Sequence, residues 1–68
     1  MKTIEFTIRT ARQAVEIILD DNYFSQMEQE SSNSFILPEF ENEDDEEQFI
    51  YDLEEILQEN GVTEYSIK

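Results

Sequence analysis

A run of carboxylates between residues 41 and 59 is the feature of this sequence whose residue types and spacing could do chemistry. Paired carboxylates support glycoside hydrolysis, and carboxylate oxygens bind calcium. Neither role fits well. The run lacks the glycine that an EF-hand loop needs at its sixth position, and it leads directly into a predicted helix. A chain of 68 residues also has little room for a substrate cleft.

Two residue types that commonly do chemistry are missing altogether. The sequence contains no cysteine and no histidine. The usual general bases, thiol nucleophiles, and ligands of zinc, haem and iron–sulfur clusters are therefore absent. We expect a protein that is not an enzyme and has no cofactor and no dedicated metal site.

The charge balance is strongly negative. Eighteen acidic residues face four basic ones, for a formal net charge of −14. Solvent-facing helices usually mix Glu with Lys, which gains about 0.2–0.5 kcal/mol per i,i+4 pair. Here pairs such as Glu55 and Glu59 repel instead. General solubility could explain such a surface, but we favour a basic partner. The four bases lie near the ends of the sequence: Lys2, Arg9, Arg12 and Lys68.

The elements that would position these acids can be predicted from the apolar pattern. Alternation of Ile4, Phe6 and Ile8 predicts a strand over residues 3–8. Thr10 stands three residues before Gln13, a capping-box spacing that predicts the start of a helix ending near residues 20–22.

The second half of the sequence predicts a hairpin, a helix and a last strand. Residues 23–40 are expected to form the hairpin, with Pro38 at a sheet edge or a strand end. The clearest helix runs from Asn42 to Asn60, where Gly61 is a typical stop. Residues 62–67 then read as the final strand, with Tyr65 and Ile67 facing inward.

This order of elements predicts an α+β fold. The pattern β-α-β-β-α-β favours a ferredoxin-like two-layer sandwich, and a three-stranded sheet with two helices is the alternative. Residues 1–68 are expected to form a single acidic α+β domain. No apolar run is long enough for a membrane span, and the lack of cysteine suits the cytoplasm. The predicted core consists of Ile4, Phe6, Ile8, Val15, Ile18, Leu19, Phe35, Leu37, Phe49, Leu53, Ile56 and Leu57.

The predicted partner-binding surface lies on and before the second helix. Its apolar arc should face the core and leave the acids outside, with Tyr51 among them. Tyrosine is enriched in binding hot spots, so Tyr51 is a candidate anchor. The candidate binding residues are Glu41, Glu43, Asp44, Asp45, Glu46, Glu47, Tyr51, Asp52, Glu54, Glu55 and Glu59.

In its size, its charge and its lack of catalytic residues, the chain resembles small phage-borne inhibitors that mimic nucleic acid, such as anti-CRISPR and anti-restriction proteins. Residues 43–52 are similar to an acidic stretch in one family of inhibitors of the RNA-guided CRISPR nuclease. That stretch also runs from clustered acids into an aromatic–Tyr–Asn–Asp-like segment. The resemblance implies that residues 44–47 occupy a DNA-binding or protospacer-adjacent-motif groove, in the host cytoplasm if a phage encodes the chain.

Two hypotheses on function follow. Because duplex DNA carries one negative charge per roughly 1.7 Å of axis, a groove built for phosphates would attract an acidic helix. The first hypothesis is a stoichiometric inhibitor, of the anti-CRISPR kind, that blocks the basic groove of a nuclease or other nucleic-acid-binding effector. The chain itself would bind neither nucleic acid nor membrane. The second is an acidic adaptor or regulatory protein that binds a basic protein without competing with nucleic acid.

Overall fold

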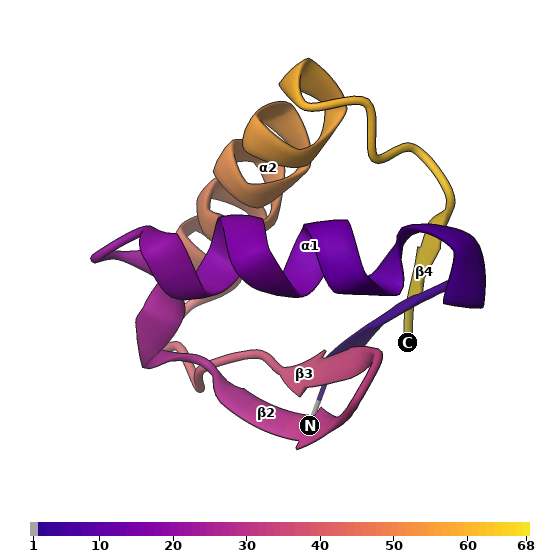
Figure 1. Ribbon diagram of the computed structural model, residues 1–68. Coiled ribbons are helices and arrows are strands. Elements are labelled where there is room, and N and C mark those ends of the chain that lie inside the picture. The colour runs from indigo at the N-terminus through magenta and orange to yellow at the C-terminus, as the bar shows by residue number, and fades with distance from the viewer. Residues whose placement is uncertain (1) are drawn as a thin grey trace.

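The computed structural model describes residues 2–68 and has an α+β fold. Two helices cover the same side of a four-stranded antiparallel sheet (Figure 1). The three-stranded alternative is therefore not the arrangement that forms. The elements are β1 (Thr3–Phe6), α1 (Ile8–Asp20), the 3-10 turn η1 (Phe24–Gln26), β2 (Glu28–Ser31), β3 (Ser34–Ile36), α2 (Glu43–Glu59) and β4 (Tyr65–Ile67). In the sheet the strands lie in the order β2-β3-β1-β4.

The junction of β1 and α1 differs from the prediction. Ile4 and Phe6 are buried as expected, but the strand ends at Phe6. Thr7 is the N-cap of α1, and its carbonyl accepts the N–H of Ala11 at 2.9 Å. The predictions that Ile8 belongs to the strand and to the core are wrong. Ile8 begins the helix on its outer side and is 91% exposed.

The start and the apolar face of α1 also differ from the prediction. Thr10 lies inside the first turn, so the predicted cap at Thr10 is wrong. The buried residues are Ala11, Ala14 and Ile18. Leu19 was predicted in the core but is 52% exposed, because one further residue turns the side chain by about 100° from Ile18.

The predicted hairpin forms over only part of residues 23–40. Strands β2 and β3 pair with each other, but Phe24 begins the turn η1 instead of a strand. The carboxylate of Asp21 starts this turn by accepting the N–H of Phe24 at 3.1 Å. Phe24 and Met27 are both buried and join the core, which the sequence pattern did not indicate. Pro38 follows β3, so it stands just past a strand end.

Helix α2 confirms the predicted helix to within one residue at each end. Asn42 is its N-cap and Asn60 its C-cap. Gly61 has a φ of 83°, a left-handed conformation that glycine adopts without a steric penalty. The predicted arc is confirmed: Phe49, Leu53 and Leu57 are buried, and Ile50 and Ile56 pack against the core at its edges.

Strand β4 is shorter than predicted and begins only at Tyr65. Val62, expected to start that strand, instead packs fully buried beneath the end of α2, where its N–H donates to the carbonyl of Leu57 at 2.9 Å. The buried side chains form one cluster between the helices and the sheet. Among residues 2–68, no helix is long and apolar enough to cross a membrane.

Candidate partner-binding surface on helix α2

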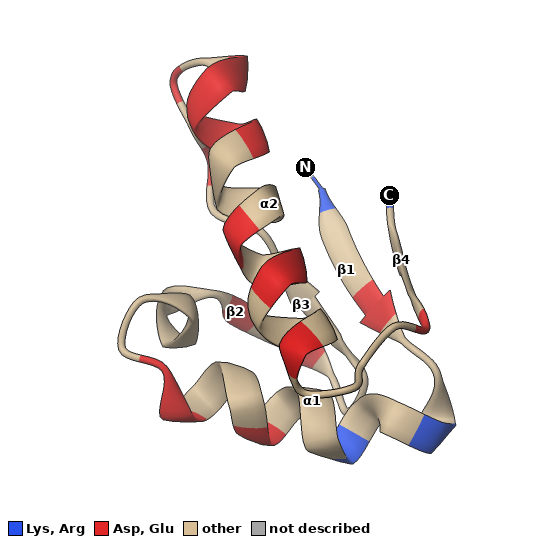
Figure 2. Ribbon diagram, turned by 90° about the horizontal axis from the view of Figure 1, so that it is seen from above, with Lys and Arg blue, Asp and Glu red and all other residues tan. Residues whose placement is uncertain are grey.

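Helix α2 presents its acidic side to solvent because its apolar side is fixed in the core. Nine of its seventeen residues are acidic and none is basic. Figure 2 shows acidic positions along its whole length. At 100° per residue, seven side chains lie within about 60° of the direction opposite the buried Leu53. These seven, all exposed, are called the outward face of α2: Asp44, Glu47, Gln48, Tyr51, Glu55, Gln58 and Glu59.

The first turn of α2 has its own structural reason for carrying acids. The Asn42 side-chain oxygen accepts the N–H of Asp45 at 2.9 Å, and the Asn42 amide donates to the Asp45 carboxylate at 3.1 Å. The four residues after the cap are all acidic, which complements the positive end of the helix dipole. The dipole therefore accounts for part of the cluster at the helix start. It does not account for Glu55 or Glu59 in the second half.

Besides Asp45, which bonds to the cap residue Asn42, three predicted site residues are held by neighbours inside the molecule. Glu46 forms an ion pair with Lys2 at 2.5 Å. Asp52 accepts a hydrogen bond from the Gln48 amide at 3.0 Å, and Glu54 accepts one from the Tyr65 hydroxyl at 2.7 Å. All three acids are half-buried. The bond of Glu46 joins α2 to Lys2, just before β1, that of Glu54 joins it to β4, and that of Asp52 lies within α2. These three acids are therefore less available to a partner than the exposed candidates.

The groups that contact these acids have shifted pKa values. The hydrogen bond and the charge of Glu46 raise the pKa of Lys2, and Glu43 and Glu47 raise it further. Burial of the phenol raises the pKa of Tyr65, and the neighbouring Glu54 acts in the same direction. Both shifts keep the groups in the states that hold α2 in place, a charged ammonium and a neutral phenol.

The other eight predicted site residues are exposed. Tyr51 is 64% exposed and lines a shallow hollow with Glu54, Glu55 and Gln58 on the solvent side of α2. The exposed acids make no ion pair with any described residue. Such carboxylates are free to accept hydrogen bonds from Arg and Lys side chains of another molecule. They are Glu41, Glu43, Asp44, Asp45, Glu47, Glu55 and Glu59.

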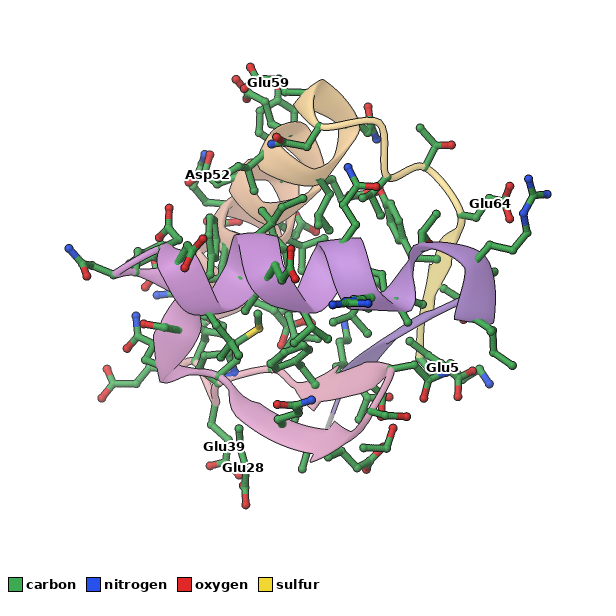
Figure 3. All side chains as sticks on the ribbon, viewed as in Figure 1. Glu5, Glu28, Glu39, Asp52, Glu59 and Glu64 are labelled. Carbon is green, nitrogen blue, oxygen red and sulfur yellow. The ribbon has the colours of Figure 1, made fainter. Side chains whose placement is uncertain are left out.

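Acids also gather on another side of the molecule, which the sequence reasoning did not single out. Figure 3 shows Glu28 and Glu39 pointing the same way beside the hairpin, far from Asp52 and Glu59 on α2. Glu28 and Glu39 border one small hollow. The pairing of β2 with β3 brings them together, so strand register was the signal needed to find them.

Within residues 2–68 no group of three or more acidic side chains is arranged to hold a metal ion. What the arrangement can do chemically is attract and pair with cationic groups. No family model matches the chain, and no curated protein or solved structure is significantly similar to it.

Proposed function

We propose that the protein is a stoichiometric inhibitor that mimics nucleic-acid phosphates and blocks the basic groove of a DNA- or RNA-binding effector. The outward face of α2 carries this proposal. It consists of four carboxylates, one tyrosine and two glutamines, and none of these carboxylates forms an ion pair with a described base. Repulsion between like charges along a solvent-facing helix has no benefit for the isolated domain. A cationic groove would relieve that repulsion and attract the carboxylates.

The charge spacing of α2 supports mimicry. A helix of 17 residues is about 25 Å long at 1.5 Å per residue. Its nine acids therefore average one charge per about 3 Å, against roughly 1.7 Å for duplex DNA. Residues 43–47, five consecutive acids, reach about the duplex value. The start of α2 is thus the part that best imitates a phosphate backbone.

Tyr51 supports a specific contact in addition to electrostatic attraction. It lies between Glu47 and Glu55 on the outward face, about one helical turn from each. A ring in this position can stack on an arginine that pairs with either carboxylate. The charges would attract the target, and Tyr51 would hold the complex after contact.

A defence nuclease is the target class that fits these features. The resemblance to phage-borne anti-CRISPR and anti-restriction inhibitors supports it, and such a target places the protein in the host cytoplasm. The inhibitor would act without turnover. We also propose that the fold is of the ferredoxin-like kind, which the alternation of strands and helices supports.

The test compares two variants of equal net charge. In the first, Asp44→Asn, Glu47→Gln, Glu55→Gln and Glu59→Gln neutralise the outward face. In the matched control, Glu28→Gln, Glu30→Gln, Glu39→Gln and Glu64→Gln remove four exposed charges from other elements. The chain is first used as bait in cells that express defence nucleases. Competition between the purified nuclease, its nucleic acid and each variant is then measured by electrophoretic mobility.

Mimicry predicts that the outward-face variant loses at least tenfold in inhibition and that the control keeps most of it. Each close charge pair across a protein interface can contribute about 1.5 kcal/mol or more of coupling energy, so the loss should be large. If the nuclease binds the chain and its nucleic acid at the same time, mimicry is wrong.

The adaptor remains a second candidate because of the Glu28–Glu39 group. Negative charge on two sides of the molecule suits a protein that joins basic partners. The adaptor predicts that both variants weaken capture of a partner and that added nucleic acid does not release that partner.

A further inference from the structure

Helix α1 exposes a line of apolar side chains. Ile8 is 91% exposed, Leu19 is 52% exposed, and Val15 is half-buried at the edge of the core. At 100° per residue these three lie within an arc of about 40°. We call them the apolar stripe of α1. Isolated exposed apolar residues are ordinary, but three along one helix line form a surface that can be covered.

The apolar stripe borders a groove beside the hairpin. Ile8, Ala11 and Val15 form one wall, and Gln29, Ser32 and Asn33 form the other. In Figure 1, α1 crosses the front of the molecule with no described element in front of it. A second helix could therefore approach the stripe.

The charges of α1 indicate what could cover this face. Its two arginines, Arg9 and Arg12, are matched by Glu16 and Asp20, so α1 has no net charge although the whole chain has a net charge of −14. The acidic face of α2 would repel another copy, but α1 would not do so directly. Arg12 and Glu16 are 94% and 68% exposed, and 3.8 Å separates Arg12 Nε from Glu16 Oε1. A pair this exposed contributes little within the chain, so both groups can be redirected to another molecule.

The stripe is self-complementary when two helices run antiparallel. Positions 8 and 19 are symmetric about the midpoint between Gln13 and Ala14, and positions 12 and 16 are nearly symmetric about the same point. A two-fold axis there sets Ile8 of one copy opposite Leu19 of the other. It also places Arg12 of each copy beside Glu16 of the other. An interface of this kind uses the same residues on both subunits.

We propose that two copies of the chain associate through α1, packed antiparallel about a two-fold axis. Because this interface uses α1, and α2 is a separate helix that crosses a different part of the molecule (Figures 1 and 2), the outward face of α2 stays uncovered. The dimer therefore presents two acidic faces. This inference does not depend on the proposed inhibition, since it rests on α1 alone.

The test is the oligomeric state of the full chain, measured by sedimentation equilibrium over a hundredfold range of concentration. Repulsion between the copies is screened over about 8 Å at physiological ionic strength, which is the condition to use. The wild-type chain should pass from monomer to dimer within that range. Leu19→Asp should remain monomeric, and Tyr51→Asp on α2 is the matched control that should still form dimers. Circular dichroism checks that both variants remain folded, as expected for exposed positions.

Charge exchange tests the two-fold arrangement itself. Arg12→Glu alone and Glu16→Arg alone should each weaken the dimer at least fivefold, because like charges then meet twice. An equimolar mixture of the two variants should restore association as a heterodimer, since opposite charges then face each other again across the axis. A wild-type chain that stays monomeric, or a dimer that survives Leu19→Asp, overturns the proposal. Charge exchanges without effect overturn the antiparallel two-fold arrangement.

Discussion

Helices α1 and α2 pack on the same side of one sheet and contribute to the same core, but their solvent-exposed sides differ in charge and polarity. Helix α2 exposes carboxylates with no base among them, and α1 exposes Ile8 and Leu19 beside balanced charges. The helix starts differ too. Asn42 caps α2 with a side-chain hydrogen bond, whereas the Thr7 side chain makes none to the α1 backbone.

The comparison separates the surfaces of each helix that stabilise the monomer from those that do not. The buried positions of both helices are ordinary apolar residues, chosen for packing. Beyond the first turn of α2, the outer positions do not help the isolated domain, because one set repels itself and the other leaves apolar surface in water. These features, which cost stability in the monomer, are the ones on which the proposed binding and the proposed dimer rest.

The largest expected effect concerns burial. Leu53→Ala on α2 removes a fully buried side chain and should lower the free energy of unfolding by about 2–5 kcal/mol. Leu19→Ala on α1 should lower it by less than about 1 kcal/mol, because half of that side chain is already in water. Urea denaturation at low protein concentration measures both. Equal losses would mean that Leu19 belongs to the core after all.

The two helix caps should differ next. Asn42→Ala removes the acceptor of the Asp45 N–H and should destabilise the fold by about 1 kcal/mol. Thr7→Ala should cost only a few tenths of a kcal/mol, because the Thr7 hydroxyl contacts only that of Thr10, at 3.3 Å. Thermal unfolding of the pair is the measurement. A larger loss for Thr7→Ala would show that the start of α1 depends on its hydroxyl.

Misplaced charges at the helix ends should give smaller effects of the opposite sign. Arg9 lies in the first turn of α1 and Glu59 in the last turn of α2, each at the unfavourable end of the dipole. Arg9→Glu and Glu59→Lys should each stabilise the monomer by about 0.3–1 kcal/mol at low salt. The gain should shrink as sodium chloride is added. A stabilisation that salt leaves unchanged would point to packing instead.

The smallest effect concerns repulsion over the whole molecule. Added sodium chloride should raise the melting temperature by a few degrees, because it screens like charges beyond about 10 Å. The increase should be reduced in the variant with a neutralised outward face of α2. Melting temperatures that do not change with salt would mean that the acids are too dispersed to repel appreciably.

The sequence predicted α2 well because several local signals agree there. Asn42 is a strong cap, Gly61 is a typical stop, and the apolar arc spans the helix without a break. The start of α1 was harder to predict. Alternation from Ile4 to Ile8 continues across the point where strand becomes helix, and Thr7 and Thr10 are equally reasonable caps. Periodicity alone could not decide between them.

The candidate site was predictable only as far as helical phase determines it. The angle around α2 correctly placed Tyr51 and Glu55 in solvent. It could not show that Glu46 pairs with Lys2 or that Glu54 binds Tyr65, because those partners come from other elements. Phe24 was missed in the core for a related reason, since a three-residue turn has no periodic pattern.

The pairing of β1 with β4 has a consequence for how the chain folds. Ile4 lies opposite Ile67, so these strands join residues about 60 positions apart, whereas β2 and β3 meet across a tight turn. Closing so long a loop costs more entropy, and contacts of this kind slow folding. The hairpin and the helices should therefore form before β4 docks. A circular permutant that links Lys68 to Lys2 and opens the chain at Ser32 would make β4–β1 the local hairpin. Stopped-flow refolding would then show β4 docking among the earliest steps.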